Sequence, residues 1–408
     1  MIVEKSNSHT RKPHLRRLPT GLSGLLPALA LSFFAASANA ETNLAPIKFT
    51  NACAGTSHIT IGAVGDFLMH DPLQKKAARQ KTFANQWRMF HRYTHGADIM
   101  YGNLETPTAR GITRDQREAA DPGFVWDNEV YTSYQWFNVH PKLVEDIKAT
   151  GFDVVSTANN HALDRGAIGV TKTIDELERS GLPFTGTRRS GEKRDWHAVV
   201  EKNGFKTAWL ACTFILNSDF LKKGDREGQV LSCNSKQTLS LIKRLAGEHD
   251  AVIVTPHWGH ENHDAPAAYQ IKAAKMFLDA GAAMILGAHP HTLQPMEKHI
   301  TPDGRETFVI YSLANFISFQ PAMKNKATVM LFVGLSKDRT GQTFINGVRF
   351  VPAFMRNRTG NLMDVEVLPI EEGRAYGQEG LEHILKILPK ENMMRYGDAI
   401  VTNPECQR

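Results

Sequence analysis

The chain has 408 residues, of which 42% are hydrophobic and 9% aromatic, and its formal net charge is +6. This composition supplies ample apolar surface for a packed core, in one large domain or two smaller ones. Residues 1–40 carry five of the basic side chains and only one acidic side chain, so the remainder has a net charge of about +2. The charge therefore indicates no nucleic-acid partner.

Residues 1–40 have the composition of a secretory signal peptide. Basic residues gather between Arg11 and Arg17, and the apolar run "GLSGLLPALALSFFAA" follows them. Ala38 and Ala40 stand at the small-residue positions of a cleavage site, directly before Glu41. We therefore expect an exported protein, periplasmic or associated with the cell envelope. An uncleaved anchor is the alternative interpretation.

From residue 58 onward, short apolar runs typical of strands alternate with stretches of helical periodicity. The expected order is strand 58–65, helix 71–80, helix 84–93, strand 97–105, helix 140–151, strand 152–161, helix 167–181, strand 182–186, helix 236–249, strand 250–259, helix 266–281 and strand 282–291. Strands that alternate with helices favour an α/β architecture. Residues 106–133 interrupt the pattern, and a long loop of this kind is usually functional or mobile.

After about residue 296 the pattern changes to successive strands. The expected elements there are strands 307–317, 327–336, 343–354 and 363–370, followed by an amphipathic helix at 380–391. Two packed sheets with helices outside explain this order better than one open sheet. We expect one domain over residues 58–335, to which residues 336–408 add further strands and a helix.

The four cysteines, Cys53, Cys212, Cys233 and Cys406, have a spacing that fits no zinc motif. An even number in an exported chain indicates disulfides. Four cysteines allow three connectivities, which the sequence leaves open.

Polar side chains follow the apolar strands where each strand ends. They are Asp66, Asn103, Glu105, Asn159, Asn160, His161, Asp164, His257, His260, Glu261, His289 and His291. Ligands gather at the carboxyl ends of strands in α/β sheets, so these side chains are expected to converge on one site. Imidazole, carboxylate and amide groups without thiolate suit zinc, manganese or iron(II) at a hydrolytic centre.

Single residues of this set also have simpler interpretations. Asn159 and Asn160 are good turn formers, and Asp164 suits the N-terminus of the helix that follows. The joint pattern, with metal-binding groups at five strand exits, favours a metal centre.

The order of these motifs resembles that of the CapA, or poly-γ-glutamate capsule-synthesis, family. The motifs are "GDFLMH", "NLETP", "GFDVVSTANNHALDRG", "HWGHE", "GAHPHTLQP" and "YSLANF", and they cover roughly residues 58–320. The resemblance implies a metallophosphatase-like (calcineurin-like) fold, which is a β-sandwich of two sheets flanked by helices, or α/β/β/α.

The resemblance also implies a centre for one or two divalent ions, zinc, manganese or iron. The implied ligands are Asp66, Glu105, Asn160, His257, His289 and His291, with Glu105 as the bridge between the two ions. His161 would be the general acid or would stabilise the transition state, and Asp164 would orient it. The candidates for substrate contact are Arg110, Arg114, Asn159 and Trp258.

Three positions depart from the family pattern. Leu68 stands where metallophosphatases carry a histidine, so the first ion could be weakly held. Asn138 stands where the family tends to have arginine, and Ala314 replaces a glycine.

We therefore expect a protein that makes, transfers or trims a capsule-type polyanionic polymer, through a metal-dependent hydrolase-type site. A membrane-bound capsule synthase is the expected partner. One alternative is a phosphodiesterase or phosphatase that acts on a phosphoester unrelated to capsules. The other is a non-catalytic polymer-binding scaffold on a decayed metal site.

Overall fold

A computed structural model describes residues 44–217, 229–357 and 365–407, which belong to one unit spanning Thr42–Arg408. The expected signal segment, residues 1–40, lies outside the described residues. Within the described ranges, none of the helices is both long enough and apolar enough to cross a membrane.

The first sheet has strand order β14-β13-β12-β1-β2-β3-β4, and β11 pairs with β1 off this path. Its strands are β1 (Ser57–Phe67), β2 (Ile99–Leu104), β3 (Val154–Ser156), β4 (Phe184–Thr185), β11 (Asn315–Ile317), β12 (Ala327–Lys337), β13 (Thr343–Asn357) and β14 (Val365–Pro369). From β1 to β4 the pairs are parallel, and from β1 to β14 they are antiparallel. The carboxyl ends of β1, β2 and β3 therefore meet at one edge.

The second sheet has strand order β5-β6-β7-β8-β10-β9. Its strands are β5 (Ala198–Lys202), β6 (Phe205–Thr213), β7 (Ala251–His257), β8 (Met284–Leu286), β9 (Leu293–Ile300) and β10 (Glu306–Leu313). The pairs from β6 through β7 and β8 to β10 are parallel, and the outer pairs are antiparallel.

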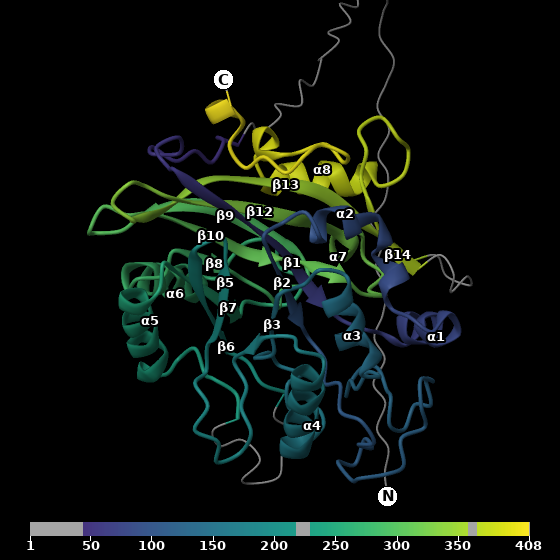
Figure 1. The fold of residues 1–408 in the computed structure, drawn as a ribbon. Helices are drawn as coiled ribbons and strands as arrows, with labels where there is room; N and C mark the ends of the chain where they lie inside the picture. Colours follow the sequence, from purple (N-terminus) through teal and green to yellow (C-terminus); the bar gives the residue numbers. More distant parts are fainter. Residues whose placement is uncertain (1–43, 218–228, 358–364, 408) are drawn as a thin grey trace, which may run out of the picture. The chain divides into compact units, whose positions relative to one another are not determined.

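The two sheets pack face to face (Figure 1). Alternate residues of β1, Ile59, Ile61 and Ala63, share one buried cluster with Trp209 and Ile253 of the second sheet. Successive side chains of a strand point to opposite faces, so the other face of the first sheet needs its own cover.

Helices provide that cover on both outer faces. The helices are α1 (Asp71–Gln80), α2 (His91–Thr94), α3 (Lys142–Ala149), α4 (Gly166–Arg179), α5 (Lys236–Glu248), α6 (Ala268–Asp279), α7 (Met323–Lys326) and α8 (Gln378–Ile387). A second buried cluster joins α1, α3 and α4 to the outer face of the first sheet, and a third joins α5 and α6 to the second sheet. The expected α/β/β/α sandwich is confirmed.

Several expected elements differ in the structure. The expected helix 84–93 is two 3₁₀ turns, Ala84–Gln86 and Arg88–Phe90, followed by the short α2. The expected strand 152–161 pairs only over Val154–Ser156, because its last residues turn into the site. Strands β5, β6 and β9 were not predicted. Strand β12 crosses the expected boundary at residues 335 and 336, so both segments share one sheet.

The long loop between β2 and α3 is irregular but firmly held. The Asn138 side chain exchanges hydrogen bonds with the backbone of Ala109 and donates to Val130 O. The guanidinium of Arg165, which is fully buried, donates to Trp136 O and to Thr132 Oγ1. Asn138, where the family tends to have arginine, therefore holds the loop in place.

Disulfides join Cys53 to Cys406 and Cys212 to Cys233. The first links the segment before β1 to the last 3₁₀ turn, Pro404–Gln407. The second links the end of β6 to the residues before α5. No cysteine among the described residues is free.

Candidate metal centre

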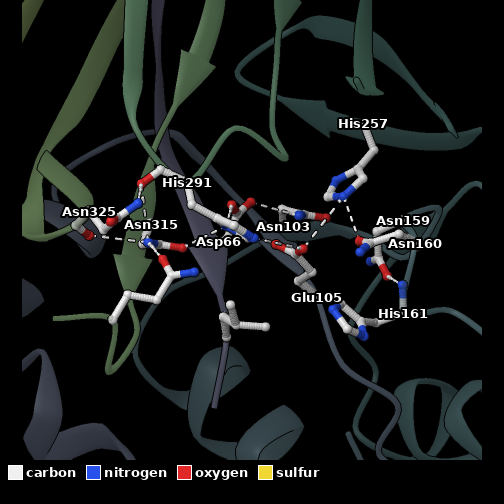
Figure 2. A network of polar contacts seen from close by, with 12 residues as sticks. Asp66, Asn103, Glu105, Asn159, Asn160, His161, His257, His291, Asn315 and Asn325 are labelled. Atoms are coloured by element: carbon white, nitrogen blue, oxygen red, sulfur yellow. Dashed lines mark hydrogen bonds and ion pairs between the residues drawn. The ribbon is translucent and has the colours of Figure 1, made fainter. Parts of the chain in front are cut away.

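The ends of strands from both sheets meet at one buried site (Figure 2). From the first sheet, β1 delivers Asp66 and β2 delivers Asn103, with Glu105 directly after it. From the second sheet, β7 ends at His257. The turn between β8 and β9 carries the last two members, His289 and His291.

Two groups of side chains in this site have the spacing of metal ligands. Asp66, Glu105 and His291 form one group, and Glu105, His257 and His289 form the other. Within each group the candidate ligand atoms lie within 4.8 Å of one another, and all the residues are buried. Glu105 belongs to both groups, as a bridging carboxylate would.

Asn160 adjoins the second group. Its Oδ1 lies 2.8 Å from Nε2 of His257, and that nitrogen lies 3.5 Å from Oε1 of Glu105. The amide oxygen therefore stands beside the imidazole where a second ion would be held.

The carboxylate of Asp66 is positioned by a chain of side-chain hydrogen bonds. Asn103 Nδ2 donates to Asp66 Oδ1 at 2.8 Å, and Asn103 Oδ1 accepts from Ser156 Oγ at 2.6 Å. The hydroxyl of Tyr101 donates to Ser156 Oγ at 2.9 Å. Since all four residues are buried, this chain of bonds fixes the carboxylate of Asp66 in one orientation.

The imidazoles of the second sheet are positioned by an unusual backbone. His289 has φ of 99° and His291 has φ of 57°, both in the left-handed region. Residues other than glycine adopt this region at a cost of about 1–3 kcal/mol each, and such residues cluster at functional sites. The turn begins at Gly287, where an added Cβ would clash with the carbonyl oxygen of Tyr311.

The hydrogen bonds of His291 indicate which nitrogen can bind a metal. Its Nδ1 lies 3.2 Å from Asp66 Oδ2 and 3.0 Å from Asn315 Oδ1, and both of these atoms can only accept. Nδ1 therefore carries the proton. Nε2 is left with its lone pair, 3.8 Å from Oε1 of Glu105.

The residues fit a bound cation. Both carboxylate oxygens of Glu105, Nδ1 of His257 and Nδ1 of His289 are buried and have no hydrogen-bond partner among the described residues. Burial, followed by the charge of Asp66, holds the pKa of Glu105 well above its usual value. Burial and neighbouring imidazoles lower the pKa of His289 to about 3 and that of His257 well below its usual value. Neutral imidazoles beside a carboxylate without a partner are the form in which these groups bind divalent metals.

His161 lies beside the two groups and is held by Asp164. Its Nδ1 donates to Asp164 Oδ2 at 2.7 Å, and the same oxygen accepts from the backbone N–H of Phe137, also at 2.7 Å. The ring of Phe137 packs edge-on against the imidazole. With Nδ1 engaged, Nε2 is the nitrogen of His161 that remains available for chemistry.

The four residues expected to contact the substrate already have partners within the described protein. Asn159 is buried, and its amide joins Leu104 O to the backbone N–H of His161. Trp258 is fully buried, and its indole donates to Tyr311 O inside the layer that includes α5 and α6. Both side chains therefore hold the backbone next to the site through hydrogen bonds within the protein.

The two expected arginine contacts have other partners. Arg110 pairs with Glu176 and Asp121, and Arg114 donates to Asn128. In the part of the chain that the structure describes, neither guanidinium contacts the metal-ligand groups.

Leu68, the residue in place of the expected histidine, is buried. His70 does not substitute for it, because it stands at the N-terminus of α1 and belongs to neither ligand group. Its Nδ1 lies near Leu68 O and the backbone N–H of Phe319, and its ring packs against Phe137.

Two site residues were missed by sequence reasoning. Asn315 of "SLANF" accepts from His291, and Asn217 donates its backbone N–H to Asn160 O at 3.1 Å. Asn315 stands in a quoted motif, so its place after an apolar strand was a usable signal. Asn217 lies in a loop without periodicity, and its sequence context gives no such signal.

Comparison with known proteins confirms the family that the order of the sequence motifs indicated. The family described as "Bacterial capsule synthesis protein PGA_cap" matches residues 60–320. The chain is 28% identical to the capsule biosynthesis protein CapA of Bacillus anthracis over 324 residues, which cover 78% of this chain and 72% of that protein. It is 27% identical to the PGA biosynthesis protein CapA of Bacillus subtilis (strain 168) over 280 residues, 68% of each chain.

Among solved structures, the NAD nucleotidase (NadN) of Haemophilus influenzae aligns with a TM-score of 0.42 and 10% identity, over 86% of this chain and 58% of that one. The family match covers most of the residues from β1 to β11 and every proposed metal ligand. On this evidence, the chain belongs to the bacterial capsule synthesis protein family PGA_cap.

Proposed function

We propose that this protein acts at the cell envelope in making, transferring or trimming a poly-γ-glutamate-like capsule polymer, through a metal-dependent hydrolase-type centre. The observation that carries this proposal is the pair of buried ligand groups that share Glu105. Membership of the capsule synthesis family supports the polymer as the substrate class. The two disulfides support an exported location, because disulfides persist in oxidising compartments.

When bound, one or two divalent ions would supply Lewis acidity and an activated water at the bond that is cleaved. The residues of the chain do the rest. Asp66 is oriented by Asn103, and Glu105 is common to the group with His291 and the group with His257 and His289. His161, held by Asp164 through Nδ1, would give a proton from Nε2 to the leaving group.

The first experiment is metal analysis of the full chain by mass spectrometry, with the variants His289→Ala and His291→Ala. We expect about one or two equivalents of metal in the parent and a loss in both variants, which should stay folded. His260→Ala is the matched control, because His260 is exposed and belongs to none of the ligand groups. A parent that binds no zinc or manganese even when they are supplied would contradict the catalytic proposal.

Activity assays then separate the candidate substrates. Hydrolysis of a γ-glutamyl polymer that is lost in His289→Ala would support the capsule role. Hydrolysis of simple aryl phosphates alone would support the phosphodiesterase or phosphatase alternative.

A non-catalytic scaffold that holds the polymer or a membrane-bound capsule synthase is the second candidate. The observation that favours it is Leu68, a buried apolar side chain where a metal ligand is expected. It predicts that capsule production survives the loss of both His289 and His291.

A further inference from the structure

The loop after β7 brings one more carboxylate to the metal centre. Glu261 forms a third group with His289 and His291, whose candidate ligand atoms lie within 4.8 Å of one another. The two histidines are buried, whereas Glu261 is exposed. This third group therefore lies where the centre opens to solvent.

The backbone holds Glu261 in this place. The backbone N–H of Asn262 donates to Pro290 O at 2.8 Å, directly between the two histidines. Asn325 Nδ2 lies 2.8 Å from Asn262 Oδ1 and 3.1 Å from His291 O, so one amide group bonds to both segments. These hydrogen bonds thus join the segment that carries Glu261 to the turn that carries His289 and His291.

The carboxylate of Glu261 has no hydrogen-bond or ion-pair partner within residues 44–217, 229–357 and 365–407. The nearby cation Lys324 pairs instead with Asp264 and with Asn262 O. Nδ1 of His289, a residue only 5% exposed, is also without a partner. One ligand atom of Glu261 thus lies within 4.8 Å of two buried imidazoles, and a carboxylate with two imidazoles is a donor set that divalent metals take.

We propose that Glu261 is an additional metal ligand, which completes the centre on its open side through His289 and His291. Among the described residues, the first ligand group consists of Asp66, Glu105 and His291, and position 68, where the family resemblance implies a histidine, holds a leucine. Glu261 forms a group with the same His291 from the solvent side, and its carboxylate would supply a further donor where Leu68 supplies none. This inference rests on the proposed metal centre and adds a residue to it.

The test is titration of the metal-free full chain with manganese(II) or zinc(II), followed by calorimetry or by competition with a chelator. We expect Glu261→Gln to lower the affinity for the more weakly bound ion about tenfold or more. Even supporting groups around metal ligands are worth about 10- to 100-fold in affinity. Glu261→Asp, which keeps the charge on a shorter side chain, should recover part of the affinity.

Asp264→Asn is the matched control, because it removes one negative charge from the same loop at a residue outside the ligand groups. It should bind metal within about twofold of the parent. Equal affinities for Glu261→Gln and the parent, or equal losses in Glu261→Gln and Asp264→Asn, would overturn the assignment of Glu261 and leave the proposed function intact. A parent that binds no metal would overturn both.

Discussion

The two sheets supply different chemistry to the same site and hold it in different ways. The first sheet contributes oxygen donors, Asp66 and Glu105, near the ends of the parallel strands β1 and β2, and a chain of side-chain hydrogen bonds orients Asp66. The second sheet contributes imidazoles, and two of them, those of His289 and His291, are carried by residues with left-handed backbone conformation. Substitutions that remove side-chain hydrogen bonds should therefore disturb mainly the carboxylates of the first sheet, which we call the oxygen side. Substitutions that alter backbone conformation should disturb mainly His289 and His291.

The two carboxylates of the first sheet differ in how well their oxygens are hydrogen-bonded. Asp66 has Asn103 as a donor, but no described donor reaches either oxygen of Glu105. A buried carboxylate without a partner destabilises the fold unless a cation is bound. Of the two carboxylates, Asp66 is thus positioned by the protein, whereas Glu105 would gain its partner only from a bound cation.

The largest effect is expected at Glu105, the residue common to both ligand groups. Glu105→Gln should lose all of the metal bound by the parent and its hydrolytic activity, because the amide carries no charge. The metal-free variant should be as stable as the metal-free parent or more stable, since a buried unpaired carboxylate is removed. Metal analysis and thermal unfolding check this. A marked loss of stability in the metal-free variant would contradict the account of Glu105.

The next effect tests the hydrogen bonds of the oxygen side. Asn103→Leu removes the donor to Asp66 and leaves Ser156 Oγ without its acceptor. We expect the free energy of unfolding to fall by about 3 kcal/mol, since two buried polar groups lose a partner. Denaturant unfolding measures it, with Ser156→Ala as a milder control. A change below about 0.5 kcal/mol would show that Asp66 does not depend on this network.

In the metal-free protein, a change of pH should alter the stability contributions of His289 and Glu105 in opposite directions. His289 has a pKa of about 3 in the folded chain against 6.5, so the unfolded state binds more protons between these values. Stability must therefore fall as the pH drops below 6.5. The pKa of Glu105 is raised, so its contribution falls as the pH rises above 4.5.

Unfolding temperatures measured at several pH values separate these effects. His289→Asn should weaken the loss on the acidic side, and Glu105→Gln should weaken the loss on the alkaline side. Parallel curves for His289→Asn and the parent between pH 7 and 5 would contradict a buried neutral imidazole at position 289.

The smallest effect concerns the backbone beside Asn315. Ala314 has φ of 59°, and its carbonyl accepts from the backbone N–H of Asp66 at 3.0 Å. Ala314→Gly should raise the free energy of unfolding by about 1 kcal/mol, because the left-handed conformation costs a residue with a Cβ about that much. Ala109→Gly, at another fully buried alanine whose φ is not positive, should lower it instead. Equal signs for the two substitutions would contradict the backbone argument.

Sequence alone predicted the α/β/β/α architecture and the strand exits, because apolar runs that end in polar residues mark strand ends in a sheet of this kind. It did not predict the roles of side chains next to ligands. Trp258 follows His257, and successive side chains of an extended chain point to opposite sides, so Trp258 packs under α5 and α6 while His257 enters the site. The alternation of side chains along the strand therefore separates the role of Trp258 from that of His257.

Contacts between segments far apart in the chain were beyond sequence reasoning. Arg110, which the sequence suggested as a substrate contact, instead pairs with Glu176, 66 residues away. Asn262 meets Pro290 only because the turns after β7 and β8 lie side by side. Such pairings depend on how the strands are ordered in the sheet, which composition and spacing do not specify.

The disulfide between Cys53 and Cys406 has a mechanical consequence. The two cysteines are 353 positions apart, and all the strands and helices α1 to α8 lie between them. A pull on the residues before Cys53 is transmitted through the sulfur–sulfur bond to Cys406, so strand β1 is not peeled from its neighbours. The two ends of the described fold therefore share such a load, and the end of β1 that carries Asp66 is relieved of part of it.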